Sequence, residues 1–349
     1  MDEFKAQVAA LLRTDAYPLR VHRIRCKPTH MAMVFLTDRH AWKLRRPLLR
    51  GRMDFRTRTA RERDALSEAG LDAHFAPGVC LGIARLQPCP GNAQGWVLRH
   101  PADPLAVEGE PVVCMRRLPA SGMLDHLVRV DRVRQVALKR GLQTLACRLS
   151  QRHRYDTSSI KLIDHHRQRG HQLIDSLRNP IYRQPSGQLQ EIGALLQACI
   201  DRQREALATR ARSGRIRDGH GDLRPEHVCL EGAWVRHHGP AFIDALEFSD
   251  ELRMLDPLQE VAGLAIECEF IGSHDIHARI REAWMDLDRH APIGLWLLHT
   301  AQHALMRALH ALWHLDTMRK PMQAQPWQER GEHWIRLARR QLLYSMSVH

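Results

Sequence analysis

The segment DGHGDLRPEHVCL, residues 218–230, concentrates chemically active side chains in what its Pro and Gly content predicts to be a loop. Among its side chains are the carboxylate of Asp222, the guanidinium of Arg224 and the imidazoles of His220 and His227. A further acid, Asp244, follows two apolar residues in FIDALEF, which has the pattern of a short strand. Two acids on neighbouring segments can divide the work of a base and of a cation ligand.

The spacing of these groups resembles the catalytic loop of protein kinases, H-R-D-x-x-x-x-N. In that loop the Asp accepts the proton of the substrate hydroxyl and the Asn holds a metal ion. Here His220-Gly221-Asp222 is followed at the Asn position by His227. Asp244 then takes the place of the acid that binds Mg²⁺ over the phosphates.

Phosphoryl transfer leaves little covalent work for the protein, so catalysis is positioning and charge neutralisation. A cation must reach the phosphates from the other side of the nucleotide. Lys43, in HAWKLRRP on a predicted strand, suits that task. Glu62, on the helix that follows, is the predicted ion-pair partner of Lys43.

These groups must be positioned by two different kinds of structure. The first part of the chain has strand patterns at AMVFLT, AWKL, GVCLGIARLQ, GWVLRH and EPVVCMRRLP, with one helix predicted over 54–75. The remainder is mostly helical, and its strongest amphipathic patterns are GLWLLHTAQHALMRALHALWHL and PWQERGEHWIRLARRQLLYSM. We therefore expect an α+β, two-lobed fold with a β-rich N-terminal lobe over 1–118 and a larger α-helical lobe over 119–349.

Composition narrows the function classes. The 349 residues are 44% hydrophobic, which is typical of a globular chain, and no stretch approaches the length of uncharged residues that a membrane span needs. None of the eight cysteines forms a C-x-x-C pair, so we expect reduced thiols and a cytoplasmic location. The net charge of +13 favours phosphate-bearing partners and disfavours polycations, while an aromatic content of 5% argues against a nucleic-acid surface.

The motifs HGDLRPEH, FIDALEF and LDPLQEVAGLA together resemble the aminoglycoside phosphotransferase and choline kinase branch of the protein-kinase-like fold. Further segments, including THMAMVFLTDRHAWKLRRP and VVCMRRLPASGMLDHL, are similar to an uncharacterised bacterial group of aminoglycoside phosphotransferase family enzymes, some of which are fused to a P-loop kinase domain. The resemblance covers roughly residues 22–316, and this chain has no P-loop motif of its own.

The resemblance implies an ATP-dependent kinase that uses Mg²⁺, with Asp222 as catalytic base and Asp244 as principal metal ligand. Lys43 would hold the α- and β-phosphates, and Glu62 would pair with it. His220 would orient the loop, and Arg224 would neutralise the transferring phosphate. The hinge to the adenine would be residues 113–118, including Cys114, Met115 and Arg116. Glu260 would support the catalytic loop.

Three features depart from the family pattern. His227 stands in place of the Asn, and imidazole suits Mn²⁺ or Zn²⁺ better than Mg²⁺, so Mn²⁺ is an alternative cofactor. The turn CKPTHM has no glycine, which leaves Thr29, His30 and local amides to meet the phosphates. Gln259-Glu260 stands where the family has x-Asp.

Two other function classes remain open. The His227 substitution and the glycine-free turn are compatible with a nucleotide-binding pseudokinase, and His220, Asp222, His227 and Asp244 together are compatible with a metal hydrolase. For the kinase, we expect a small-molecule acceptor that is neutral or anionic, because a polycation would need a cluster of acids, for which Glu267 and Glu269 are the candidates.

Overall fold

A computed structural model describes residues 2–50, 53–89, 95–289, 291–317 and 321–347. The chain forms two compact units. The first contains Met1–Met123 together with His227–Asp250, and the second contains Leu124–Glu226 together with Glu251–His349. A stretch from the second half of the sequence, which includes Asp244, therefore belongs to the same unit as the N-terminal sheet.

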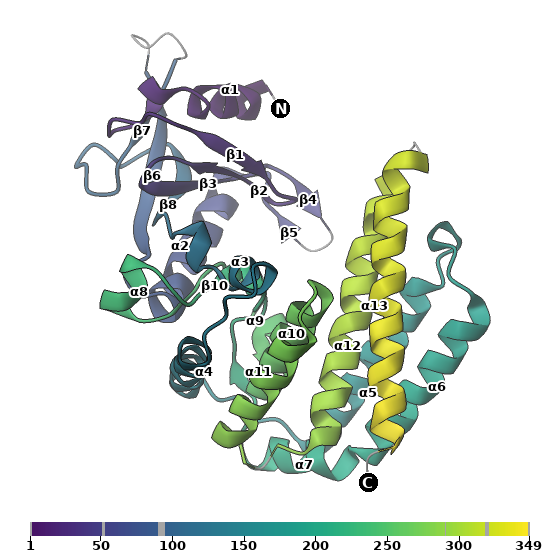
Figure 1. Ribbon diagram of the computed structural model, residues 1–349. Helices are drawn as coiled ribbons and strands as arrows, with labels where there is room; N and C mark the ends of the chain where they lie inside the picture. Colours follow the sequence, from purple (N-terminus) through teal and green to yellow (C-terminus); the bar gives the residue numbers. More distant parts are fainter. Residues whose placement is uncertain (1, 51–52, 90–94, 290, 318–320, 348–349) are drawn as a thin grey trace. The chain divides into compact units, whose positions relative to one another are not determined.

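The first unit is built on a six-stranded antiparallel sheet with the order β1-β2-β3-β8-β6-β7 (Figure 1). Its strands are β1 (Arg25–Pro28), β2 (Ala32–Leu36), β3 (His40–Arg45), β6 (Cys80–Pro88), β7 (Trp96–Arg99) and β8 (Glu110–Arg116). Side chains of β3 alternate between the two faces, because successive residues of a strand point to opposite sides. Trp42 and Leu44 enter a core that also contains Leu11 of helix α1 (Asp2–Leu11), and this leaves Lys43 for the other face.

Helix α2 (Arg58–Phe75) carries an unusual buried face. Thr57 caps the helix by accepting a hydrogen bond from the Ala60 N–H. Three acids follow one another at intervals of four residues and are all buried: Asp64, Glu68 and Asp72. Such spacing places them along one side of a helix. The helix therefore buries a column of carboxylates in addition to the apolar side chains of Ala65, Leu71 and Phe75.

The segment His227–Asp250 adds a small hairpin to the first unit. Strands β10 (Val228–Cys229) and β11 (Ala241–Phe242) pair antiparallel, and helix α8 (Ala233–His238) lies between them in sequence. The sequence predicts a short strand at FIDALEF, and β11 overlaps that segment at Phe242. Two short strands, β4 (Leu49–Arg50) and β5 (Met53–Asp54), form a separate ribbon.

The second unit is helical. Helix α12 (Ile293–Leu312) packs along α13 (Pro321–Ser347), and the two run side by side in Figure 1. Helix α10 (Pro257–Phe270) contacts both α11 (His274–Leu287) and α12 and is buried over most of its length. The other helices are α3 (Leu124–Arg129), α4 (Gln135–Ser150), α5 (Ser159–Leu177), α6 (Ser186–Arg202), α7 (Arg204–Arg212) and α9 (Asp250–Arg253). Strand β9 (Arg217–Asp218) pairs with β12 (Met254–Leu255).

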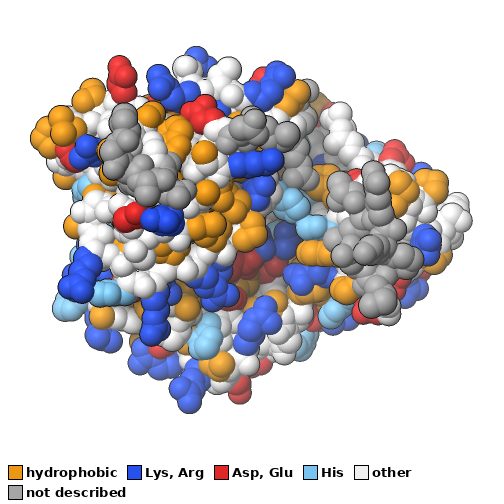
Figure 2. All heavy atoms as spheres, turned by 90° about the horizontal axis from the view of Figure 1, so that it is seen from above, with side chains coloured by type: hydrophobic (Ala, Val, Ile, Leu, Met, Phe, Trp, Pro, Cys, Tyr) orange, Lys and Arg blue, Asp and Glu red, His pale blue; other side chains and the backbone are white. Residues whose placement is uncertain are grey.

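No helix of the described residues is long and apolar enough to cross a membrane. All eight cysteines are free thiols. Figure 2 shows Lys and Arg side chains spread over the visible face, with Asp and Glu side chains among them. On that face the basic residues do not gather into one continuous patch.

Candidate active site

The loop that carries Asp222 is anchored in the second unit by buried ion pairs. Asp218, the last residue of β9, accepts a hydrogen bond from Arg253 Nε at 2.8 Å and pairs with Arg152. The Gly221 N–H donates to Glu260 Oε1 at 2.5 Å, so the first turn of α10 holds the loop backbone. Gly221 has a φ of 82°, a conformation that glycine adopts without strain.

Glu260 is a buried acid in an unusual ionisation state. Burial raises its pKa to about 7, and the hydrogen bond from Gly221 opposes the rise. A carboxyl group of this kind changes charge near neutral pH. The predicted role of Glu260 as a support for the loop agrees with this contact.

Asp222 is accessible, since 38% of its side chain is exposed. Arg224 Nη1 lies 3.9 Å from Asp222 Oδ2, and the other end of the guanidinium pairs with Glu226. His220 is fully buried beneath the loop. Asp222, Arg224 and His220 thus belong to one loop of the second unit, with the acid outermost.

Lys43 is the centre of the site in the first unit. Its Nζ donates to Glu68 Oε1 at 2.9 Å and to Asp244 Oδ1 at 2.6 Å. Glu68 lies on the buried face of α2 and is only 1% exposed. A lysine on a sheet, an acid on a helix and an acid after the β10–β11 hairpin therefore meet at one ammonium group.

The predicted pairing of Lys43 with Glu62 is wrong. Glu62 pairs with Arg85 of β6 on a more exposed side of α2. A separation of six residues turns a helix by about 240°, so Glu62 and Glu68 point in different directions. The sequence offers both acids on the same helix, and only the rotation of α2 against the sheet selects Glu68.

Arg45, two residues after Lys43 on the same face of β3, is a site residue that the sequence analysis missed. Its guanidinium contacts three carboxylates, on Asp64, Glu68 and Glu247. Oxygens of these acids lie within 4.8 Å of one another, and the Arg45 guanidinium contacts all three. The regular spacing of acids on α2 and the K-L-R motif were signals that could have revealed this cluster.

Burial and crowding perturb the acids of this cluster. Burial raises the pKa of Glu68 to about 7 even though Lys43 opposes the shift, and it raises the pKa of Asp64 to about 6 against the charge of Arg45. The pKa of Asp72 is also raised by burial and by the neighbouring acids Glu68 and Asp244. Among the described residues, this cluster therefore holds more carboxylates than its two cations, Lys43 and Arg45, can neutralise.

Asp244 differs from these acids. Partial burial opposes its ionisation, yet the charges of Lys43 and His227 lower its pKa below the ordinary value. Its backbone has a φ of 61°, uncommon outside glycine, and its N–H donates to Asp72 Oδ1 at 3.2 Å. Strained backbone of this kind persists only where its surroundings hold it, and it is frequent at functional sites.

Asp244 and His227 offer donor atoms that could hold a metal ion. His227 Nε2 lies 3.4 Å from Asp244 Oδ2, and 44% of the Asp244 side chain is exposed. An accessible, ionised carboxylate fits Mg²⁺, which prefers oxygen ligands, while the imidazole fits Mn²⁺ or Zn²⁺ better. The donor set thus suits one hard cation at Asp244.

The residues predicted to contact the nucleotide lie in the same sheet, in the β1–β2 turn and on the inner strand β8. Thr29 shapes the turn between β1 and β2, because its Oγ1 accepts the Ala32 N–H at 2.9 Å. Cys114 and Met115 lie within the ladder of β8 and pair with residues of β3 and β6. The Arg116 N–H donates to Val79 O at 2.8 Å, so that amide is already used.

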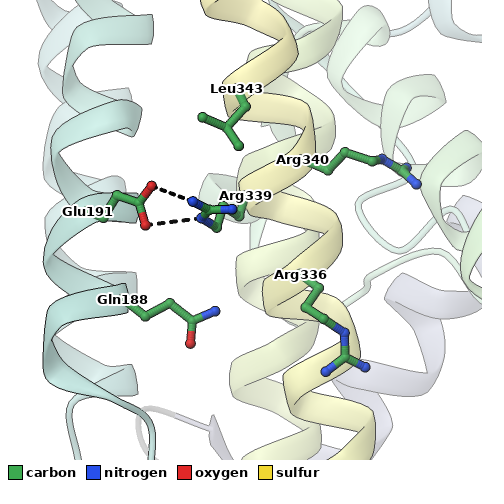
Figure 3. A pocket seen from close by; sticks show the side chains of 6 residues that line it. All are labelled: Gln188, Glu191, Arg336, Arg339, Arg340 and Leu343. Carbon is green, nitrogen blue, oxygen red and sulfur yellow. Dashed lines mark hydrogen bonds and ion pairs between the residues drawn. The ribbon is translucent and has the colours of Figure 1, made fainter.

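A surface groove of about 510 Å³ lies elsewhere in the second unit, between α6 and α13. Figure 3 shows Glu191 of α6 facing Arg339 of α13, with hydrogen bonds of 3.0 and 2.7 Å between them. The groove is also lined by Gln188, Arg336, Arg340 and Leu343. It contains none of the predicted site residues.

The comparisons with known proteins place this geometry in a known fold. No protein-family model matches the chain. Among solved structures, the GDP and kanamycin complex of APH(2")-IIia matches with a TM-score of 0.53 at 12% identity, covering 95% of this chain and 97% of that chain. The GDP complex of wild-type aminoglycoside 2'-phosphotransferase-IIIa matches with a TM-score of 0.50 at 14% identity, covering 92% and 93%. A choline kinase from Cryptosporidium parvum Iowa II matches with a TM-score of 0.52 at 10% identity, covering 99% and 97%.

The chain has the fold of the aminoglycoside phosphotransferases and choline kinases. This confirms the α+β, protein-kinase-like fold class predicted from the sequence. An uncharacterised protein of Mycobacterium tuberculosis is 31% identical over 267 residues, covering 75% of this chain and 49% of that protein. The chain thus spans about half the length of the curated relatives it matches.

Proposed function

We propose that the chain is an ATP-dependent phosphotransferase that acts on a hydroxyl group of a small molecule. The observation that carries the proposal is the meeting of Lys43 with Glu68 and Asp244. In protein kinases an ion pair between a strand lysine and a helix glutamate, together with a metal-binding Asp, positions the phosphates of ATP. The structural neighbours include GDP complexes, which supports use of a nucleotide.

In this proposal, Glu68 holds the Lys43 ammonium where it can contact the α- and β-phosphates of the nucleotide. Arg45 fixes Glu68 from the other side and also anchors Glu247, which follows Asp244 in the chain. Asp244 would ligate Mg²⁺, with His227 as a neighbouring donor that would also accept Mn²⁺. A bound divalent ion supplies charge neutralisation for the phosphates.

Asp222 is the proposed base for the acceptor hydroxyl. Its carboxylate is exposed, and its loop is fixed by Glu260 and by the Asp218 ion pairs, so its position is preorganised. Arg224 lies close enough to Asp222 to neutralise charge on the transferring phosphate. His220 would fix the loop from below. Residues 113–118 and Thr29 are proposed to meet the adenine and the phosphates.

Two alternatives rest on His227. A nucleotide-binding pseudokinase is compatible with an imidazole at the second metal position and with a phosphate turn that Thr29 shapes without glycine. A metal hydrolase would need His220 as a ligand, but that ring is fully buried, which counts against it. The pseudokinase is therefore the second candidate.

Two substitutions test the leading proposal. We expect Asp222→Asn to retain nucleotide binding but to lower ATP-dependent product formation by about 10²–10⁴-fold, the usual contribution of a general base. We expect Asp244→Asn to abolish the stabilisation that ATP and Mg²⁺ confer in a thermal shift assay. Asp175→Asn, at an exposed aspartate of α5, serves as the matched control.

The readouts are a screen of hydroxyl-bearing metabolites for phosphorylated products and thermal shifts with ATP and either Mg²⁺ or Mn²⁺. A wild-type chain that nucleotides do not stabilise contradicts both the kinase and the pseudokinase. Nucleotide binding without any product, with Mn²⁺ included, favours the pseudokinase.

A further inference from the structure

Three arginines from separate elements of the second unit surround a buried glutamate, Glu267 of α10. Arg307 of α12 places Nε 2.7 Å from Glu267 Oε1, and His303 places Nε2 3.1 Å from the same oxygen. Arg224 of the Asp222 loop and Arg330 of α13 are near enough to interact electrostatically with Glu267. We call Arg224, Arg307 and Arg330 the basic cluster.

Glu267 and Glu269, the acids of α10 near the basic cluster, already form ion pairs. Glu267 is 3% exposed, and although burial opposes its ionisation, Arg307 and His303 lower its pKa to about 2. Glu269, two residues further on, contacts His277 Nδ1 at 2.5 Å and also pairs with Arg340. The two acids that could have recognised a cationic acceptor are thus neutralised within the fold.

Two aromatic rings hold the guanidiniums of Arg307 and Arg330. Phe270, at the end of α10, stacks on Trp334 of α13 with 4.0 Å between ring centroids and 7° between planes. The Arg330 guanidinium lies 4.6 Å from the Phe270 centroid, and that of Arg307 lies 6.0 Å from the Trp334 centroid. A guanidinium over an aromatic face is oriented without losing its hydrogen-bond donors at the edge.

The carboxylates of this region contact Arg224 and Arg307. Among the described residues, Arg224 pairs with Glu226 and lies 3.9 Å from Asp222, and Arg307 pairs with Glu267. Arg330 has no carboxylate within ion-pair distance among those residues. Its pKa is lowered by burial first and then by the like charge of Arg307, as expected for a cation that lacks a full counter-charge.

We propose that the basic cluster binds the anionic group, a phosphate or a carboxylate, of the molecule whose hydroxyl faces Asp222. Arg224 links the two functions, because it lies 3.9 Å from Asp222 and belongs to the cluster. Arginine pairs with planar carboxylates and with phosphates through two parallel hydrogen bonds. The identity of the ligand as phosphate acceptor rests on the proposed function, whereas the anion preference itself does not.

Three compounds of one skeleton test the proposal: glycerol 3-phosphate, glycerate and glycerol. Their binding to the full chain is measured by isothermal titration calorimetry, with and without a non-hydrolysable ATP analogue. We expect both anionic compounds to bind at least tenfold more tightly than glycerol. Arg330→Gln should weaken the anionic compounds about tenfold or more, which is the usual effect of losing a charge-assisted hydrogen bond.

Two further variants control for folding and for general charge. Arg336→Gln removes an exposed arginine from the same helix, on the side that lines the α6–α13 groove, and should change the affinity less than twofold (Figure 3). Arg330→Lys keeps the charge without the planar fork and should restore part of the affinity. Circular dichroism and thermal unfolding establish that each variant is folded.

Equal binding of the three compounds overturns the proposal, and so does an equal effect of the Arg330 and Arg336 substitutions. A glycerol 3-phosphate signal that disappears in Lys43→Met but persists in Arg330→Gln would place the anion in the first unit and also overturn it. If ATP does not bind but the Arg330-dependent preference for anions persists, the proposed function fails and the anion site stands.

Discussion

Replacing Lys43 by Met tests the charge balance of the first unit most directly. The ammonium is buried and contacts both Glu68 and Asp244, so its removal leaves two carboxylates without their counter-charge. Removing one partner of a buried ion pair typically costs about 3–5 kcal/mol. Because the cluster already contains more acids than cations, we expect Lys43→Met to lie in that range near pH 8.

The stability lost in Lys43→Met should increase as the pH rises. Burial raises the pKa of Glu68 from its ordinary 4.5 to about 7, so the folded chain holds this proton more tightly than the unfolded chain. Stability attributable to Glu68 is therefore lost as the pH rises from about 4.5 to about 7. Without Lys43 the pKa of Glu68 rises further, so the stability difference between variant and wild type should be smaller at pH 5.5, where the loss falls mainly on ionised Asp244, than at pH 8.

A second substitution tests the contribution of the Lys43–Glu68 ion pair separately. Glu68→Gln removes the charge and keeps the shape, so the double variant Lys43→Met/Glu68→Gln should recover more than half of the lost stability at pH 8. Arg85→Gln is the matched control, because Arg85 pairs with Glu62, whose side chain is 27% exposed. Such partly exposed pairs contribute about 1 kcal/mol or less.

The assay is urea unfolding followed by circular dichroism at pH 5.5 and pH 8, with the free energy of unfolding extrapolated to water. The reasoning is refuted if Lys43→Met and Arg85→Gln cost the same at pH 8. It is also refuted if the Glu68→Gln substitution destabilises the Lys43→Met background instead of rescuing it.

Two further predictions concern the second unit. Burial raises the pKa of Glu260 to about 7, so wild-type stability should decline as the pH rises from about 4.5 to 7. Glu260→Gln can still accept the Gly221 N–H, and it should flatten that decline in thermal unfolding. Parallel pH profiles of variant and wild type would contradict the assignment. Arg210 binds Asp256 through two hydrogen bonds of 2.6 Å and contacts Asp288 at 2.7 Å. Arg210→Met should therefore lower the free energy of unfolding in urea by about 3–5 kcal/mol. A loss below about 1 kcal/mol would show that these buried acids find other partners.

The local sequence pattern was sufficient to predict the main helices and strands and the directions of some side chains. Apolar residues at Trp42 and Leu44 alternate with Lys43, and the period of a strand then sends the lysine to the opposite face from the core. The helix expected over 54–75 is present as Arg58–Phe75, and Thr57 caps its first turn. The loop around Asp222 was evident from its composition and spacing.

Contacts between distant segments could not be predicted in the same way. The choice of Glu68 over Glu62 depends on how α2 is rotated against the sheet, and that rotation is set by packing along the whole helix. The contacts of Arg45 depend on bringing Glu247 beside β3 from the far side of the sequence.

The sequence by itself determined the α+β class, the strand that carries Lys43 and the segments that carry the two candidate acids, because periodicity and turn chemistry are local properties of the chain. Only the tertiary structure decided which acid meets Lys43 and that Arg330 lies over Phe270. Ion pairs and cation–π contacts act over a few ångströms between residues far apart in sequence, and no local pattern specifies those distances.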